Sequence, residues 1–197
     1  MDPAKSLEKI IVSRTRAKLL RVLFYLPGEL YYVRQLVKLT GEALNSVRRE
    51  LRNLEAAELV ESEWRGNKLF YWVNQNYPFF QEILSMVLKT EGLGREIIKN
   101  RQRLGKIKFV VFSGKFARNL PRGKDEVDLL VVGRVVLPEL GALVRKEEER
   151  RQREINYTVM DEEEFRFRKK NRDPFLTQIL LQGRVMIIGD EQKLIDF

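Results

Sequence analysis

The chain has 197 residues, of which 44% are hydrophobic, and its 37 lysine and arginine residues exceed its 28 aspartate and glutamate residues by a formal net charge of +9. This length accommodates one or two domains, and the excess of positive charge suits a polyanionic partner such as nucleic acid. Cysteine and histidine are both missing, which excludes disulfides, thiolate or imidazole metal sites and histidine-dependent catalysis. No apolar run approaches the roughly 20 residues of a membrane span. The first residues also lack the basic-then-apolar form of a secretory signal, so we expect a cytoplasmic protein without a membrane partner.

The N-terminal part of the chain predicts three helices. Apolar residues recur at helical spacing over residues 19–26, 32–39 and 44–54, and Pro-Gly and Thr-Gly pairs separate the three segments. One face of the third helix is apolar. Its predicted core residues are Leu44, Val47, Leu51 and Leu54.

The opposite face of this third helix carries polar side chains suited to DNA. Arginine and asparagine can pair bidentately with guanine and adenine edges in a major groove, and serine can reach a base or a phosphate. An ordinary solvated helix face would have the same pattern. The candidate DNA-binding residues of this helix are Asn45, Ser46, Arg48, Arg49, Arg52 and Asn53.

A β-hairpin with a basic tip is predicted next. Residues 59–64 and 69–74 are rich in strand formers, and the intervening Arg-Gly-Asn-Lys turn offers glycine and asparagine for positive φ. Three helices followed by such a hairpin are typical of a winged helix. Its tip residues Arg65, Asn67 and Lys68 would lie over a minor groove or over phosphates.

Two segments, VRQLVKLTGEALNSVRRELRNLEAAELVE (33–61) and WRGNKLFYWVN (64–74), resemble the ArsR/MarR-like winged helix-turn-helix regulators. The resemblance covers about 75 residues and implies double-stranded DNA as the partner. The metal-sensing members of that group use cysteine or histidine ligands, so sensing by that route is excluded here.

A further amphipathic segment begins at Pro78. In the family that the sequence resembles, a helix after the wing commonly forms a dimer, and a homodimer would present two recognition helices to half-sites about one DNA turn apart. Packing of this helix against its own domain is the alternative. We therefore divide the chain into a DNA-binding domain (1–76), a helical linker or dimerisation helix (77–104) and a second domain (105–197). The apolar stripe comprises Phe79, Phe80, Ile83, Leu84, Val87 and Leu88.

The second domain predicts a small mixed sheet, which makes the chain an α+β protein. Strands are expected over 108–112, 127–132, 154–159 and 185–188, with helices over 137–152 and 175–181. Glu126 and Asp128 stand at the start of the second strand. Because side chains alternate along a strand, both carboxylates would point to the same face.

The segment FSGKFARNLPRGKDEVDLLVVG resembles the minimal nucleotidyltransferase domain of the DNA polymerase β superfamily, and the resemblance spans roughly residues 105–190. It implies a nucleoside triphosphate substrate and Mg²⁺ ions held by paired carboxylates. By this resemblance the metal-binding and catalytic carboxylates are Glu126 and Asp128, with Glu154 as a third. The nucleotide-binding residues would be Ser113, Gly114, Lys115 and Arg118.

Two positions depart from the family pattern. Lys115 stands where a phosphate-binding serine is expected, and it would either pair with a phosphate or neutralise Asp128. Glu126 replaces an aspartate and extends the carboxylate by about 1.5 Å, which disturbs metal geometry. Two functions therefore stay open, and with them whether the chain is an enzyme. One is a DNA-binding regulator whose second domain is degenerate or senses a ligand. The other is an active Mg²⁺-dependent nucleotidyltransferase that modifies a protein, an RNA or a small molecule. A further interpretation, which also rests on the resemblance, makes the chain itself the antitoxin-type half of a toxin–antitoxin pair, with a toxin-type protein as its partner.

Overall fold

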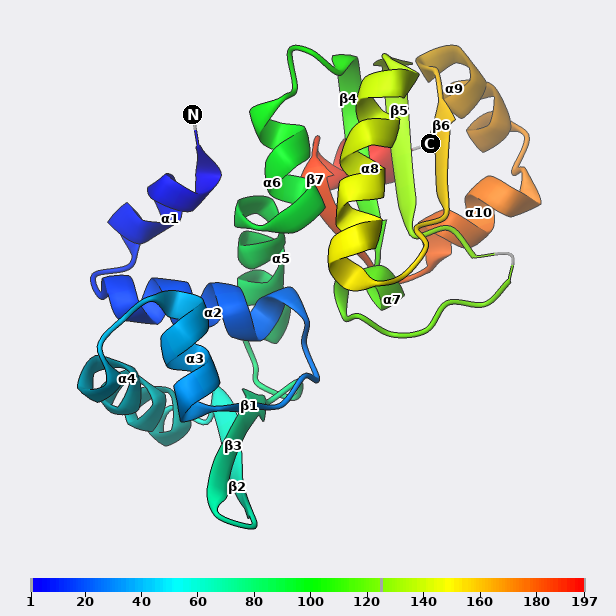
Figure 1. Cartoon of the computed structure of the whole chain (residues 1–197). Coiled ribbons are helices and arrows are strands. Elements are labelled where there is room, and N and C mark those ends of the chain that lie inside the picture. Colours follow the sequence, from blue (N-terminus) through cyan, green and yellow to red (C-terminus); the bar gives the residue numbers. More distant parts are fainter. Residues whose placement is uncertain (1, 125, 197) are drawn as a thin grey trace. The chain divides into compact units, whose positions relative to one another are not determined.

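The chain forms two compact units, residues 1–91 and 92–197, and each is described by itself (Figure 1). The computed structural model describes residues 2–124 and 126–196, with side chains for all of these except residues 6–9. Each unit mixes helices with one small sheet, in agreement with the predicted α+β class. The division falls inside the segment 77–104 that the sequence predicts as a helical linker.

The first unit contains the three predicted helices and the predicted hairpin. Two short elements were not predicted, a helix at the start and a two-residue strand that extends the hairpin into a sheet of order β1-β3-β2. The elements are α1 (Pro3–Ile10), α2 (Arg14–Tyr25), β1 (Tyr31–Tyr32), α3 (Val33–Thr40), α4 (Leu44–Ala56), β2 (Val60–Arg65), β3 (Lys68–Val73) and α5 (Phe80–Thr90).

Helix α4 turns its apolar face into the core as expected, with one exception. Val47 and Leu51 are completely buried and Leu54 is nearly so, whereas Leu44 is 38% exposed. Leu44 is the first residue of α4, and the packed face begins one turn later at Val47. The turn before α4 is made by Gly41 at φ 65°, a left-handed conformation that favours glycine.

Helix α5 uses most of its apolar stripe inside the chain. Phe80, Leu84, Val87 and Leu88 are buried, and Phe80 packs on Phe24 of α2 with 5.5 Å between the ring centroids. Of the stripe predicted for dimerisation, only Phe79 is exposed at 60%. The stripe therefore serves intramolecular packing, the alternative that the sequence left open.

A buried glutamate joins α2 to α4. Glu50 lies on the core side of α4, where its carboxylate accepts hydrogen bonds from Ser13 Oγ (2.8 Å) and Arg16 Nε (2.9 Å). Burial raises the pKa of Glu50, but the hydrogen bonds from Ser13 and Arg16 outweigh burial and leave the pKa below its ordinary value. The carboxylate is thus held in its ionised form.

The second unit is built on a four-stranded sheet of order β6-β5-β4-β7. Strand β4 pairs antiparallel with β5 and β7, and β5 pairs parallel with β6 through the crossover helix α8 (Figure 1). The elements are α6 (Gly92–Lys99), β4 (Gly105–Ser113), α7 (Gly114–Ala117), β5 (Leu129–Val135), α8 (Leu137–Arg151), β6 (Tyr157–Met160), α9 (Glu162–Lys170), α10 (Pro174–Leu181), β7 (Arg184–Ile188) and α11 (Glu191–Ile195).

Two of the predicted strands begin later than expected, and this moves the candidate carboxylates. Strand β5 starts at Leu129 and β6 at Tyr157, so Glu126, Asp128 and Glu154 all lie in the segments that precede strands. The prediction that Glu126 and Asp128 share one face of a strand is therefore wrong. Among the described residues, no helix is long and apolar enough to cross a membrane.

We predict that Glu50→Gln weakens the first unit at neutral pH. The neutral amide of the variant cannot accept charge-assisted hydrogen bonds, and because Arg16 is partly exposed the expected loss is about 1–2 kcal/mol in the free energy of unfolding. The folded-state pKa of Glu50 lies below its unfolded-state value of about 4.3. Its contribution is therefore complete above that pH and is lost as the pH falls further.

The measurement is denaturant unfolding at pH 7 and at about pH 3, followed by the fluorescence of Trp64 and Trp72, the two tryptophans of the chain. The exposed Glu58, substituted by glutamine, is the matched control. An equal deficit of the Glu50→Gln variant at both pH values would contradict the proposed role of the ionised carboxylate.

Candidate functional site

The polar face predicted on α4 is open to solvent. All of its members are exposed except Ser46, which is half-buried, and the three tip residues of the hairpin are exposed as well. The residues placed on this surface are Asn45, Ser46, Arg48, Arg49, Arg52 and Asn53 on α4, with Arg65, Asn67 and Lys68 on the hairpin.

A groove of about 800 Å³ lies between α4 and the hairpin, which projects from the helices (Figure 1). Four cationic side chains line it, and among the described lining residues none is acidic. Arg48 and Arg52 come from α4, Lys68 from β3 and Arg34 from the first turn of α3. A concave surface lined by cations of one sign attracts a polyanion and concentrates the field within it.

Trp64 adds a large aromatic surface to this groove, and the sequence reasoning did not single it out. Residues that face each other across the hairpin share a side, and Ser62 lies opposite Tyr71 while Trp64 lies opposite Leu69. Ser62 donates to Glu55 of α4, so this side of the hairpin faces the helix. Toward the tip the same side emerges into solvent, and Trp64 is 69% exposed. Side chains two positions apart on a strand lie on the same side. The sequence alone could therefore have placed Trp64 on the same side of the hairpin as Ser62.

Arg34 and Tyr32 are the other lining residues that the sequence reasoning missed. They belong to α3 and to its N-cap, and the β1–β3 pairing brings them beside the hairpin. Lys68 Nζ lies 4.7 Å from the centroid of the Tyr32 ring, which holds the ammonium at the edge of the groove. Only a pairing between residues about 40 positions apart could have revealed this neighbourhood.

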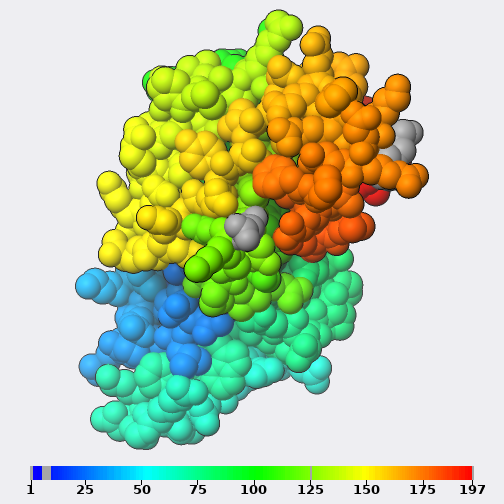
Figure 2. Space-filling model, turned by 90° about the vertical axis from the view of Figure 1, so that its right-hand side faces the viewer, coloured from blue at the N-terminus to red at the C-terminus, as the bar shows by residue number. Residues whose placement is uncertain are grey.

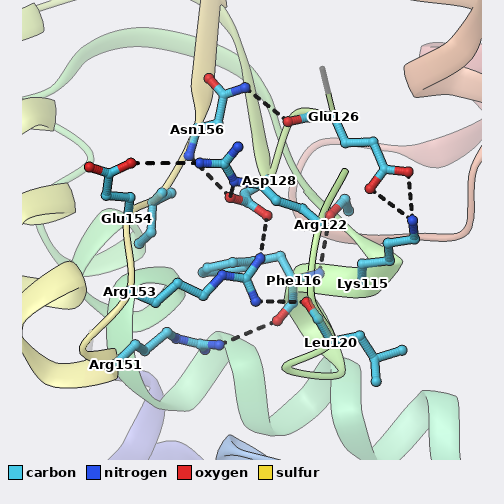
Figure 3. Close-up of polar contacts among 12 residues, drawn as sticks. Lys115, Phe116, Leu120, Arg122, Glu126, Asp128, Arg151, Arg153, Glu154 and Asn156 are labelled. Atoms are coloured by element: carbon cyan, nitrogen blue, oxygen red, sulfur yellow. Dashed lines mark hydrogen bonds and ion pairs between the residues drawn. The ribbon is translucent and has the colours of Figure 1, made fainter. Parts of the chain in front are cut away.

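In the second unit, Asp128 is completely buried and bound on both carboxylate oxygens. Arg153 donates to Oδ1 at 2.9 Å, while Arg122 Nε (3.0 Å) and the backbone N–H of Asn156 (3.0 Å) reach Oδ2 (Figure 3). The two guanidinium groups neutralise the charge and the amide completes the coordination. Asp128, Arg122 and Arg153 thus form a closed structural ion cluster, in which both carboxylate oxygens have partners from the protein.

Glu126 points away from Asp128 and toward a different cation. Lys115 Nζ contacts both of its carboxylate oxygens, at 2.6 and 2.8 Å, and the backbone N–H of Gly123 donates to Oε2 at 2.7 Å (Figure 3). The Lys115 ammonium, followed by the Gly123 amide, lowers the pKa of Glu126. The suggestion that Lys115 neutralises Asp128 is therefore wrong, because Arg122 and Arg153 take that place.

The predicted phosphate loop makes its hydrogen bonds within the protein. Ser113 caps the four-residue helix α7 by accepting from the Phe116 N–H, and the Gly114 N–H donates to the Gly183 carbonyl at 2.5 Å. A Cβ at position 114 would lie 2.7 Å from that carbonyl oxygen, so the close approach of two backbones requires glycine here. Arg118 is the C-cap of α7.

These residues do not fit a divalent metal ion. The side chain of Glu154 is 92% exposed and contacts Arg122 at 4.0 Å, and the carboxylates of Glu126 and Asp128 are each committed to a cation of the protein. Among the described residues, no three acidic side chains gather into a possible metal site. Mg²⁺ requires free oxygen ligands near an octahedral arrangement, and Asp128 has none to offer.

Comparison of the chain with protein-family models, with curated proteins and with solved structures finds no match. Function is therefore argued from the two sites themselves, the open cationic groove of the first unit and the closed ion cluster of the second.

We predict that Asp128→Asn destabilises the second unit by about 3 kcal/mol, since it leaves two partly buried guanidinium groups without their counter-charge. Glu154→Gln is the matched control, because its carboxylate is exposed and lies at the limit of contact with the same Arg122. Differential scanning calorimetry should show a lower unfolding temperature for the first variant only. Unchanged stability of Asp128→Asn would mean that the carboxylate is not a structural centre.

Proposed function

We propose that the protein is a DNA-binding regulator of the winged helix-turn-helix type, in which α4 is the recognition helix and β2–β3 is the wing. The observation that carries this proposal is the groove between them. Arg34, Arg48, Arg52 and Lys68 line it without an acidic neighbour among the described lining residues. Phosphates of a duplex supply the complementary charge, and binding should release counterions.

Two sides of α4 would serve two tasks in DNA binding, the readout of bases and the contact with the phosphate backbone. Its outer face would present Asn45 and Arg49 to base edges in a major groove, where arginine and asparagine discriminate guanine and adenine. The side chain of Asn53 is hydrogen-bonded to Glu50 instead. Arg48 and Arg52 on the groove side are placed for the phosphate backbone that passes between helix and wing. Positioning and base readout would thus use different residues of one helix.

We propose further that the second unit is a nucleotidyltransferase-like domain that has lost metal-dependent transfer. Its central aspartate is bound by Arg122 and Arg153, and the amide of Gly114 is bound by Gly183. An active enzyme would have to break the ion cluster before it could hold a metal ion. This supports a regulator over the alternative of an Mg²⁺-dependent transferase.

We predict that Arg52→Ala weakens DNA binding. Loss of one phosphate contact reduces the slope of log K against log salt by about 1 and weakens binding to all duplexes alike. Loss of a base contact by Arg49→Ala instead costs about 1–3 kcal/mol on the preferred sequence. The preferred duplex is obtained by selection from a random-sequence library and compared with an unselected duplex in titrations at several salt concentrations.

Lys146→Ala is the matched control, because Lys146 is an exposed cation of α8 in the other unit and its loss changes the net charge equally. It should leave both affinities and the salt slope unchanged. Two results would contradict the proposed role of the groove in DNA binding. One is an equal loss of affinity in Arg52→Ala and Lys146→Ala, and the other is a wild type that selects no preferred sequence from the library. The mass of the complex in the same titrations reports whether one or two chains bind.

We also predict that Trp64 loses solvent exposure when DNA binds. In a Trp72→Phe variant the remaining fluorescence of Trp64 should shift to shorter wavelength or be quenched by duplex DNA. In a Trp64→Phe variant the signal of Trp72, whose Nε1 donates to Glu61 at 2.9 Å, should change little. Trp64→Ala should weaken binding by about 1–2 kcal/mol through lost apolar contact. An unresponsive Trp64 would contradict the placement of DNA along the groove.

A further inference from the structure

A second cationic pocket lies in the second unit, beside the middle of β4 and away from the Ser113–Lys115 turn. Lys108 and Phe109 of β4 belong to it, and Lys108 lies five positions before Ser113, about 16 Å along the strand. The pocket is completed by α9, by the residues that follow it and by α11. Figure 2 shows residues of α9 and α10, in orange, covering much of one face of this unit.

The pocket has a volume of about 570 Å³ and a strongly positive lining. Two carboxylates, Glu162 and Asp196, oppose an excess of cations. The cationic residues are Lys108, Arg166, Lys169, Lys170, Arg172 and Lys193.

Half of these cations have their charge committed within the protein. Lys108 Nζ binds Glu162 at 2.8 Å, and Arg166 lies 4.0 Å from the same carboxylate. Lys169 is buried, and its ammonium donates to the backbone carbonyls of Leu194 and Asp196. These contacts fix the walls of the pocket and place a buried positive charge behind it.

The other three cations of the lining are exposed to solvent. Lys170, Arg172 and Lys193 make no ion pair with any residue that the structure describes. Three cations held around one concavity repel one another, and an anion placed between them removes that repulsion.

Arg172 is held in a conformation that side-chain-bearing residues seldom adopt. It follows Asn171, the C-cap of α9, with φ 49°, where helices commonly end in glycine or asparagine. Glu58 after α4 and Gln152 after α8 have the same left-handed conformation, with φ 60° and 51°, so this conformation marks a helix end. Glycine would relieve the strain but would remove the guanidinium from the pocket.

We propose that this pocket binds a small molecule that carries two or more phosphate groups, with Lys170, Arg172 and Lys193 as its contacts. The volume suits a ligand of that size, and the carboxylates of Glu162 and Asp196 interrupt the positive surface that a long nucleic-acid backbone would need. The site is independent of the proposed DNA contact and lies apart from the turn that resembles a nucleotide-binding loop.

The test is calorimetric titration of the full chain with inorganic tripolyphosphate, without divalent ions. Arg172→Gly should raise the unfolding temperature, because glycine adopts this φ freely, and should weaken tripolyphosphate binding about tenfold or more. Lys193→Gln should weaken binding to a similar degree. The control pair Arg145→Gln and Lys146→Gln removes exposed cations of α8 and should leave binding unchanged.

Three outcomes would overturn the proposal. One is the absence of saturable binding up to about 1 mM tripolyphosphate. A second is an equal loss of binding in the control pair, which would indicate a diffuse response to net charge. The third is binding of a single-stranded RNA or a DNA duplex that depends on Arg172 and Lys193 and that tripolyphosphate does not inhibit. That result would assign the pocket to nucleic acid.

Discussion

The buried carboxylate of Asp128 holds together three segments of the second unit. Both of its oxygens are bound by Arg122, Arg153 and the Asn156 amide, and its own backbone carbonyl accepts from the Ser113 N–H at 2.9 Å. Its backbone N–H donates to the Asn156 carbonyl at 2.8 Å. One residue therefore connects the end of β4 and the segments before β5 and β6. The cost of burying the ion is offset only because every polar atom of Asp128 has a partner.

This role has a consequence for the chemistry that the sequence motif suggests. A carboxylate that coordinates a metal must be free to present its oxygens, whereas a carboxylate that joins three segments must not move. Arg122 and Arg153 supply the positive charge that metal ions supply in the family that the sequence resembles. If the second unit is the nucleotidyltransferase-like domain that we propose, the cluster keeps its segments together while it removes the conditions for metal-dependent transfer.

Much of the first unit could be predicted from the sequence, because its information is local. The spacing of Val47, Leu51 and Leu54 gives the buried face of α4, and the Gly66–Asn67 turn gives the hairpin with its register. The arginines on the other side of α4 are exposed for the same reason, whereas Glu50, also absent from the apolar pattern, is buried. What the sequence did not indicate is the groove, because Arg34 comes from α3 and Trp64 from β2, and only tertiary packing places them together.

The second unit was harder to predict, because its polar contacts join residues that are distant in the sequence. The spacing of Glu126 and Asp128 suggested a common strand face, but the strand begins at Leu129. Arg153 lies 25 positions from Asp128, at the end of a charged stretch that also contains Arg150 and Arg151. An arginine stripe does not reveal which of its members turns inward to a buried carboxylate. That choice is made by the crossover from α8 to β6.

The Ser113 end of β4 and the middle of the same strand at Lys108 differ in how their charges are compensated. At the Ser113 end, cations and carboxylates are paired, Lys115 with Glu126 and two arginines with Asp128. Around Lys108 the cations outnumber the carboxylates, and three of them line an open concavity without an ion-pair partner among the described residues. A ligand gains most where charges are fixed but uncompensated, because it need not displace an existing partner. If this unit retains a ligand, electrostatics favours the pocket beside Lys108, which carries no recognisable motif, over the Ser113–Lys115 turn, which does.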